Sequence, residues 1–291
     1  MGDVYALLTA VCWSVAIILF RISGFHFKPI PFKVFQNFWA LVLFVFCLLL
    51  FDTLRLPDFD STQWLLLVSS AVLGVTFGDT LHVASLNRVG AGLQAILDCL
   101  YVPIVMIFAY FFFQERLSAG ELIGGLLVIV GIVIGSSSGA LPGTSKKELS
   151  VGIFFGILTQ FAHAGTVLMV KDLVDFESVL LVTFWRFLIG LSLMVFWLMI
   201  KGQASQIMEA FVWDSRLKVT VAGTLLGPFA STLFWFLSFK YTLAGRAAIY
   251  NQMASIFIIV LAALWLKEPL KKRTWLAVFI AVIGGILVKL V

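Results

Sequence analysis

The stretch Leu73–Tyr101, LGVTFGDTLHVASLNRVGAGLQAILDCLY, aligns without a gap with Leu226–Ala254, LGPFASTLFWFLSFKYTLAGRAAIYNQMA, at an offset of 153 residues (226 minus 73). The same offset continues to Gly131 and Gly284. It pairs Leu73-Gly74 with Leu226-Gly227, Ser85 with Ser238, Ala91-Gly92 with Ala244-Gly245, Ala95-Ile96 with Ala248-Ile249, and Glu115 with Glu268. Self-similarity at one fixed period predicts two related halves.

The composition around this repeat is that of a membrane protein. Hydrophobic residues make up 62% of the 291 residues and charged residues only 12%, whereas soluble domains average about 45–50% and about 25%. This excludes a soluble enzyme, a disordered chain and a nucleic-acid-binding module. The net charge of +5 is therefore expected on loops and beside lipid headgroups.

Apolar runs long enough to cross a bilayer occur ten times along the chain. A helix needs about 20 apolar residues to cross a hydrocarbon core of about 30 Å, and continuous hydrophobicity argues against a β-barrel. The expected spans are 4–22, 32–51, 63–86, 92–113, 119–137, 150–170, 178–200, 218–239, 245–266 and 274–291. We therefore predict an all-α integral membrane protein with ten transmembrane helices.

Five spans in each half give the halves opposite orientations in the membrane. The sequence predicts a first repeat at 1–139, a polar linker at 140–148 and a second repeat at 149–291. The earlier spans align at a slightly smaller offset, which places Asn37 opposite Arg186. Inverted repeats around a central cavity are typical of secondary transporters. The alternative is that duplication only doubled a helix bundle.

The repeated segments also carry motifs of a known family. The motif residues are Trp13-Ser14, Gly92, Ala95, Leu97, Tyr101-Val102-Pro103, Glu115-Arg116-Leu117, Gly124 and Gly131, with Gly245, Ala248, Glu268-Pro269-Leu270 and Gly284 in the second half. With these motifs the chain resembles the drug/metabolite transporter superfamily, specifically its EamA-type ten-helix members. The resemblance implies metabolite efflux or exchange by a secondary carrier without ATP, in a bacterial-type inner membrane. Asn37 and Ile256 depart from the family's arginine and proline.

Ionisable side chains inside the spans are few, and each is a functional candidate because burial in the membrane is costly. Asp79 and His82 share one helix face with Ser85, and Gln94, Asp98 and Tyr101 form a polar stripe. The residues expected to bind substrate in the cavity are His82, Asp98, Tyr101, His163, Arg186, Trp235 and Asn251. Asp79 and Asp98 are the expected coupling residues.

These residues favour a small polar or amphoteric metabolite, such as an amino acid. Its ammonium would lie near the two aspartates and its carboxylate near Arg186. Other roles remain open at this point. Asp79 and His82 could simply pair with each other, Arg186 could be a structural anchor, and Trp235 could face lipid.

The expected partners are a small-molecule substrate, the lipid bilayer, and protons or a counter-substrate. A buried carboxylate has a raised pKa, which suits proton coupling. We expect no cofactor, metal or nucleic acid, and no enzymatic activity. An integral-membrane enzyme acting on a lipid-linked substrate is the main alternative, and a passive channel is another. Cys12, Cys47 and Cys99 lie in apolar runs and are expected to be free.

Three further expectations concern packing and orientation. Gly131 and Gly135 form a small-xxx-small pair, which favours either close helix packing within the chain or a homodimer contact. The expected oligomeric state is accordingly a monomer or a homodimer. Ser118 and Glu121 predict a capping box. Glu115 is expected to hold the turn that follows it, just before this capping box. Thirteen of the twenty Lys and Arg residues lie on the side opposite the termini. The positive-inside rule therefore places the termini outside, whereas the family resemblance implies both termini inside.

Overall fold

The computed structural model describes residues 1–22, 29–51, 53–135, 145–205, 207, 211, 217–265 and 272–290. Most of the expected linker 140–148 therefore lies outside the described residues. The described chain is helical, with no strand in these ranges. The helices are α1 (Gly2–Ile22), α2 (Pro29–Leu50), α3 (Ser61–Ser70), η1 (Ala71–Gly78), α4 (Asp79–Asp98), α5 (Tyr101–Phe113), α6 (Ala119–Gly135), α7 (Lys146–Phe176), α8 (Val179–Ile200), α10 (Leu217–Thr224), η2 (Leu225–Ser231), α11 (Thr232–Tyr241), α12 (Ala244–Trp265) and α13 (Lys272–Leu290).

Eight helical stretches in the described ranges have the length and apolar composition to cross a membrane. Two shorter apolar stretches, Ala119–Ile134 and Trp275–Leu290, lie where the fifth and tenth spans were predicted. The expected all-α membrane class is confirmed. Large apolar side chains stay exposed on the outer surface, as on Phe46, Leu126 and Phe279, which is the surface that lipid would contact.

The predicted third and fourth spans correspond to the apolar helical stretches Ser61–Gly90 and Ile96–Phe113. The expected turn near Asn87–Ala91 is a single break at Gly90, where φ is 79° and ψ is 163°. This backbone conformation suits glycine because glycine has no Cβ. The chain then continues to Asp98, turns at Cys99 and Leu100, and resumes as α5. The predicted span 92–113 therefore corresponds to the single apolar helical stretch Ile96–Phe113, with a local irregularity at Cys99 and Leu100.

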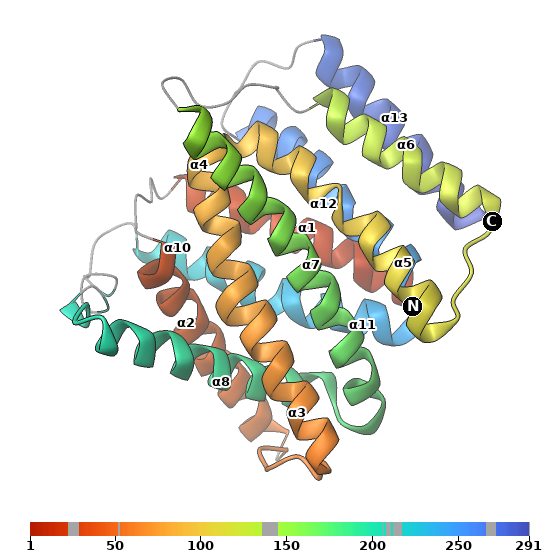
Figure 1. Ribbon diagram of the computed structural model, residues 1–291. Helices are drawn as coiled ribbons and strands as arrows, with labels where there is room; N and C mark the ends of the chain where they lie inside the picture. The colour runs from red at the N-terminus through yellow and green to blue at the C-terminus, as the bar shows by residue number, and fades with distance from the viewer. Residues whose placement is uncertain are drawn as a thin grey trace.

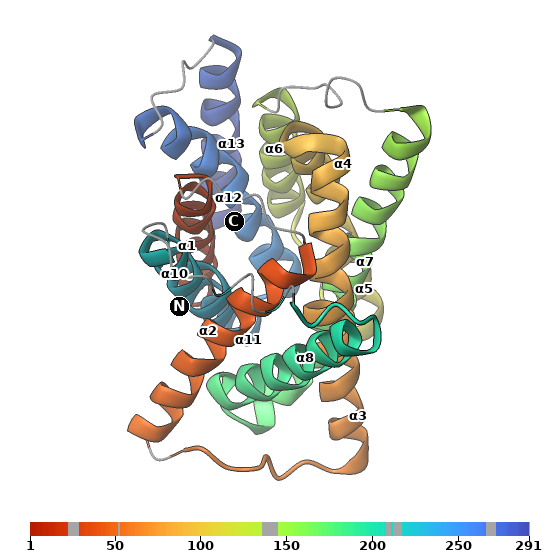
Figure 2. The ribbon, with the colours of Figure 1, turned by 90° about the vertical axis from the view of Figure 1, so that its left-hand side faces the viewer.

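Long-range helix pairs hold the fold together (Figure 1). Helix α1 packs on α12 and α11, while α7 packs on α5 and α4. Helix α2 crosses α8, as Figure 2 shows, and α6 runs beside α13. Each helix buries the stripe that faces its partner. The cavity described below lies among α1, α2, α4, α7, α8, α11 and α12.

The α6–α13 contact depends on small residues. A Cβ atom on Gly124 would lie 2.7 Å from the Gly284 carbonyl oxygen, and one on Gly131 would lie 2.8 Å from the Ala277 carbonyl oxygen. The Gly131 face is therefore occupied within the chain, as the packing interpretation predicted. It is not free for a homodimer contact.

The start of α6 and the state of the cysteines bear on two of the local predictions. The Ser118 amide donates to Glu121 Oε2 at 2.8 Å, and the Glu121 amide donates to Ser118 Oγ at 3.1 Å. The predicted capping box is confirmed. Within the described ranges, none of Cys12, Cys47 and Cys99 forms a disulfide.

Candidate functional site

Two π-helical segments lead into the polar centre of the molecule. Segment η1 ends immediately before Asp79, and η2, which contains Pro228, ends immediately before Thr232. A π-helix has a wider turn than an α-helix and often occurs at functional sites. Here each segment sets the direction in which the following helix presents its polar side chains.

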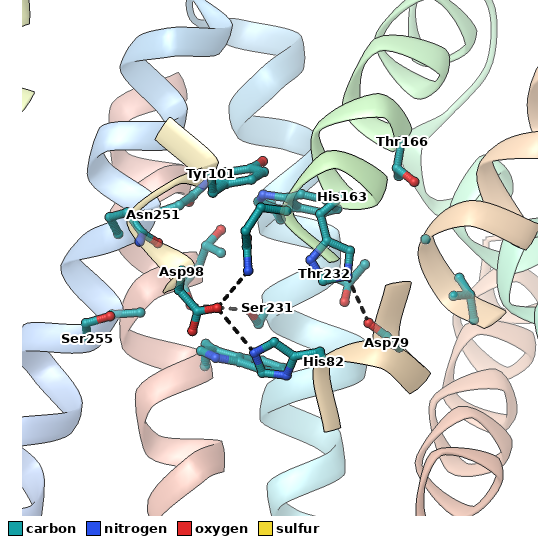
Figure 3. A pocket seen from close by; sticks show the side chains of 18 of the residues that line it. Asp79, His82, Asp98, Tyr101, His163, Thr166, Ser231, Thr232, Asn251 and Ser255 are labelled. Carbon is teal, nitrogen blue, oxygen red and sulfur yellow. Dashed lines mark hydrogen bonds and ion pairs between the residues drawn. The ribbon is translucent and has the colours of Figure 1, made fainter. Parts of the chain in front are cut away.

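These side chains surround one cavity of about 260 Å³. At about 30 Å³ per water molecule, this is the volume of roughly nine waters, so the cavity suits a small solute. All eight residues predicted from the sequence to bind substrate or couple transport line it: Asp79, His82, Asp98, Tyr101, His163, Arg186, Trp235 and Asn251. Figure 3 shows most of them around the same space.

Asp98 is held through one of its two carboxylate oxygens. Oδ1 accepts hydrogen bonds from Gln94 Nε2 and Gln160 Nε2, both at 2.8 Å. The same oxygen lies 3.5 Å from His82 Nε2 (Figure 3). Gln94 is itself fixed, because its side-chain oxygen accepts from Ser85 Oγ at 2.6 Å. The carboxylate is therefore firmly oriented.

Asp79 is the centre of a second ionic group that joins three helices. Its Oδ2 lies 3.2 Å from Lys33 Nζ on α2, and its Oδ1 lies 3.3 Å from His163 Nε2 on α7. The alternative in which Asp79 pairs with His82 is wrong, since each pairs with another residue. The His82 and His163 rings lie 6.4 Å apart, which brings the two ionic groups close together.

Arg186 lines the cavity but is engaged by the protein. The residue is 2% exposed. Its Nε donates to Ser70 Oγ at 2.9 Å and one terminal nitrogen donates to the Ser70 carbonyl at 3.2 Å. Its guanidinium also lies 4.6 Å from the centre of the Phe236 ring. These contacts favour the structural role of Arg186 in this conformation.

Aromatic and amide side chains complete the wall. Tyr101 and Trp235 have ring centres 6.4 Å apart, and Trp13 also lines the cavity. Trp235 therefore contacts the cavity, not only lipid. On α12, both amide atoms of Asn251 are buried without a hydrogen-bond partner among the described residues.

Sequence reasoning missed two polar residues that contact the aspartates of the site. Lys33, near the start of the expected span 32–51, was not among the candidate residues, but it lies in the first turns of α2 and is buried against Asp79. Gln160, which donates a hydrogen bond to Asp98, was also not among the candidate residues. Its position in an otherwise apolar run was the available signal. No group of three or more His, Cys, Asp or Glu residues that could hold a metal ion occurs in the described ranges.

A separate ionic network lies at one end of the molecule, which we call the Asp3 end. Arg246 at the start of α12 lies 3.0 Å from Asp3 on α1 and 3.3 Å from Glu121 on α6. Glu115 pairs with Lys171 on α7 and accepts a 2.6 Å hydrogen bond from the Ala244 amide. Glu115 was expected to hold its own following turn. It instead caps α12, 129 residues away.

The Asp3 end is separated from the cavity by packed apolar residues. Ala6, Ala10, Phe239 and Ala247 are at most 1% exposed and belong to one hydrophobic cluster. At the opposite end of α7, Glu148 pairs with Arg88 at 2.9 Å. Glu148 and Lys171 are separated by about 35 Å along the helix at 1.5 Å per residue. The two ends thus lie about one hydrocarbon thickness apart.

Comparisons with known proteins agree with this geometry. A model of the EamA-like transporter family matches residues 1–137 and 150–290. An uncharacterized transporter of Archaeoglobus fulgidus is 25% identical over 290 residues, which cover 98% of this chain and 96% of that protein. The uncharacterized inner membrane transporter YhbE of Escherichia coli K12 is 24% identical over 161 residues, which cover 54% of this chain and 50% of YhbE. A solved crystal structure covers 99% of this chain and 96% of its own, with a TM-score of 0.81 at 16% identity, and so shares the fold.

Proposed function

The chain belongs to the EamA-like transporter family, and we propose that it is a secondary carrier that moves a small polar or amphoteric organic metabolite by alternating access. It is a transporter and not an enzyme, and an integral protein of the plasma membrane. The observation that carries the proposal is one small cavity, whose wall contains acidic, basic and aromatic side chains. A cavity of this kind suits a solute the size of an amino acid.

The architecture that we propose is ten spans in two inverted five-helix repeats, 1–139 and 149–291. The two separate matches to the family model support it, as do the π-helical segments η1 and η2 at corresponding places in the two halves. The helix contacts support it too. Helix α1, the first of one half, packs on α12 in the fourth span of the other half, and α7, the first of the second half, packs in the same way on α5 in the fourth span of the first half. Helices α6 and α13 would then complete the ten spans as a closely packed pair.

The closed Asp3 end supports a carrier over a passive channel. The ionic network and the apolar layer beneath it separate the cavity from that end. On the other side, the cavity extends to Lys33 near the start of α2 and to Ile258 late in α12. A cavity closed toward one end is one of the two states that alternating access requires.

Counterflow in proteoliposomes tests the carrier function. A metabolite library is first screened for compounds that raise the melting temperature of the purified protein, since a bound ligand stabilises the folded state. Vesicles preloaded with such a compound should take up its radiolabelled form several-fold faster than empty vesicles. A channel would show no such trans-stimulation, and that result would reject the carrier.

Proton coupling is expected at the two aspartates. Each has a histidine beside it, His163 at Asp79 and His82 at Asp98, so a proton bound at either acid alters a local ionic group. The double variant Asp79→Asn/Asp98→Asn should remove the pH dependence of transport, because neither amide titrates. Uptake into proteoliposomes is measured at several external pH values. A double variant that keeps the wild-type pH dependence contradicts this role.

A further inference from the structure

The two oxygens of the Asp98 carboxylate have different surroundings. Oδ1 takes all the polar contacts of this side chain, from Gln94, Gln160 and His82. Within the described part of the chain, Oδ2 makes no hydrogen bond or ion pair. The side chain is 28% exposed and lines the cavity. A carboxylate offers about four acceptor sites over its two oxygens, so Oδ2 has its acceptor capacity free and is held in position.

The other charged groups on the cavity wall already have partners. Both oxygens of Asp79 are taken, one by Lys33 and one by His163. Lys33 is in turn committed to Asp79, with its side chain only 9% exposed. Arg186 donates to Ser70 and packs on Phe236. The cavity therefore offers a solute a free anionic acceptor, whereas its two permanently charged cations are engaged by the protein.

The wall of the same cavity is aromatic. Trp13, Tyr101 and Trp235 belong to one hydrophobic cluster and all three line the cavity. Figure 3 shows the Tyr101 ring on the same side of the cavity as Asp98. Aromatic faces attract a cation through the ring quadrupole and also pack well against an apolar body. The chemistry next to the free oxygen thus suits an organic ammonium that carries an apolar group of aromatic size.

We propose that Asp98 Oδ2 is the binding site for a protonated amine, and that the solute needs no carboxylate to be recognised. The ammonium donates a charge-assisted hydrogen bond to Oδ2, a type of bond that is shorter and stronger than a neutral one. The apolar body of the amine packs against Trp13, Tyr101 and Trp235. This inference rests on the proposed carrier function and specifies its substrate class as amines, with or without an acid group.

Four matched probes test the site by direct binding to the purified protein, followed through tryptophan fluorescence. They are 2-phenylethylamine, phenylalanine, N-acetylphenylalanine and 3-phenylpropionate. The two that carry an ammonium should bind with dissociation constants within about threefold of each other. The two that lack it should bind about tenfold more weakly or worse, because a charge-assisted bond is lost. Equal binding of 3-phenylpropionate and 2-phenylethylamine, or no binding by any of the four, overturns the proposal.

The substitution Asp98→Asn isolates Oδ2. The asparagine oxygen can still accept from Gln94 and Gln160, while an NH2 group replaces the free acceptor. The variant should lose about tenfold in affinity for both amines and should no longer distinguish them from the other two probes. The matched control Asp172→Asn, at an exposed position on α7, should bind all four probes as the unsubstituted protein does. An Asp98→Asn variant that keeps the preference for amines contradicts the proposal.

Binding and transport are measured separately, so their failures can be distinguished. Preference for amines without counterflow would reject the carrier function and leave the site intact. Counterflow of a solute without an amine would reject the site and leave the carrier function intact. If Asp98→Asn does not fold, the comparison of the four probes on the unsubstituted protein still decides the question.

Discussion

Replacing Lys33 by methionine is expected to lower the free energy of unfolding by about 3 kcal/mol. Removing one partner of a buried ion pair costs about 3–5 kcal/mol because the other charge is left uncompensated. Lys33 and Asp79 lie 3.2 Å apart with side chains 9% and 28% exposed. The lower end of the range applies because His163 still contacts Asp79. Thermal unfolding of the purified protein in detergent measures the loss.

A double substitution separates charge from packing. Lys33→Met combined with Asp79→Asn should recover much of the lost stability, because no unpaired charge then remains. Lys147→Met, at an exposed position in the first turn of α7, should have little effect. If Lys33→Met and Lys147→Met destabilise the protein equally, the ion pair has no special role.

Arg246→Met is expected to open the Asp3 end and to expose the cavity from that side. Arg246 joins Asp3 on α1 and Glu121 on α6, and its own side chain is 20% exposed. A shift of about 1.4 kcal/mol between the two states changes their ratio about tenfold. A cysteine at Ser255, which lines the cavity, should then react about tenfold faster with an impermeant thiol reagent added at the Asp3 end. The background carries serine in place of Cys12, Cys47 and Cys99.

The control is the ion pair at the other end. Arg88 and Glu148 have side chains 35% and 56% exposed, and exposed pairs contribute only about 0–1 kcal/mol. Arg88→Met should therefore change labelling from the Asp3 end by less than about twofold. Unchanged labelling in Arg246→Met would show that the network does not hold this end closed.

Features that depend on residues close together in the sequence were predicted correctly. The capping box at Ser118 and Glu121 follows from two residues three positions apart, and the structure has it. The family assignment followed from motifs spread over the whole chain, and it is confirmed. The eight candidate site residues were chosen because polar groups inside apolar spans are costly. That cost is removed only around a shared cavity or in pairs, and both occur here.

The missed features depend on contacts between distant segments. The expected second span began at residue 32, after Pro29 and Pro31, but proline is tolerated in the first turn of a helix, where amides lack partners anyway. Helix α2 begins at Pro29. Lys33 lines the cavity because it pairs with Asp79 of α4, a contact between segments far apart in the chain. The spacing of Asp79 and His82 suggested a mutual contact. Their actual partners come from α2, α7 and the end of α4, which no local spacing reveals.

The position of Glu115 has a consequence for the order in which the growing chain is completed. The acid leaves the ribosome before either of its partners, since Lys171 follows 56 residues later and Ala244 follows 129 residues later. At about 5–20 residues per second, Lys171 is synthesised after roughly 3–11 s and Ala244 after roughly 6–26 s. The charge of Glu115 is thus matched first by Lys171. When α12 is synthesised, the Glu115 carboxylate that accepts the hydrogen bond from its first amide is already present in the earlier half of the chain.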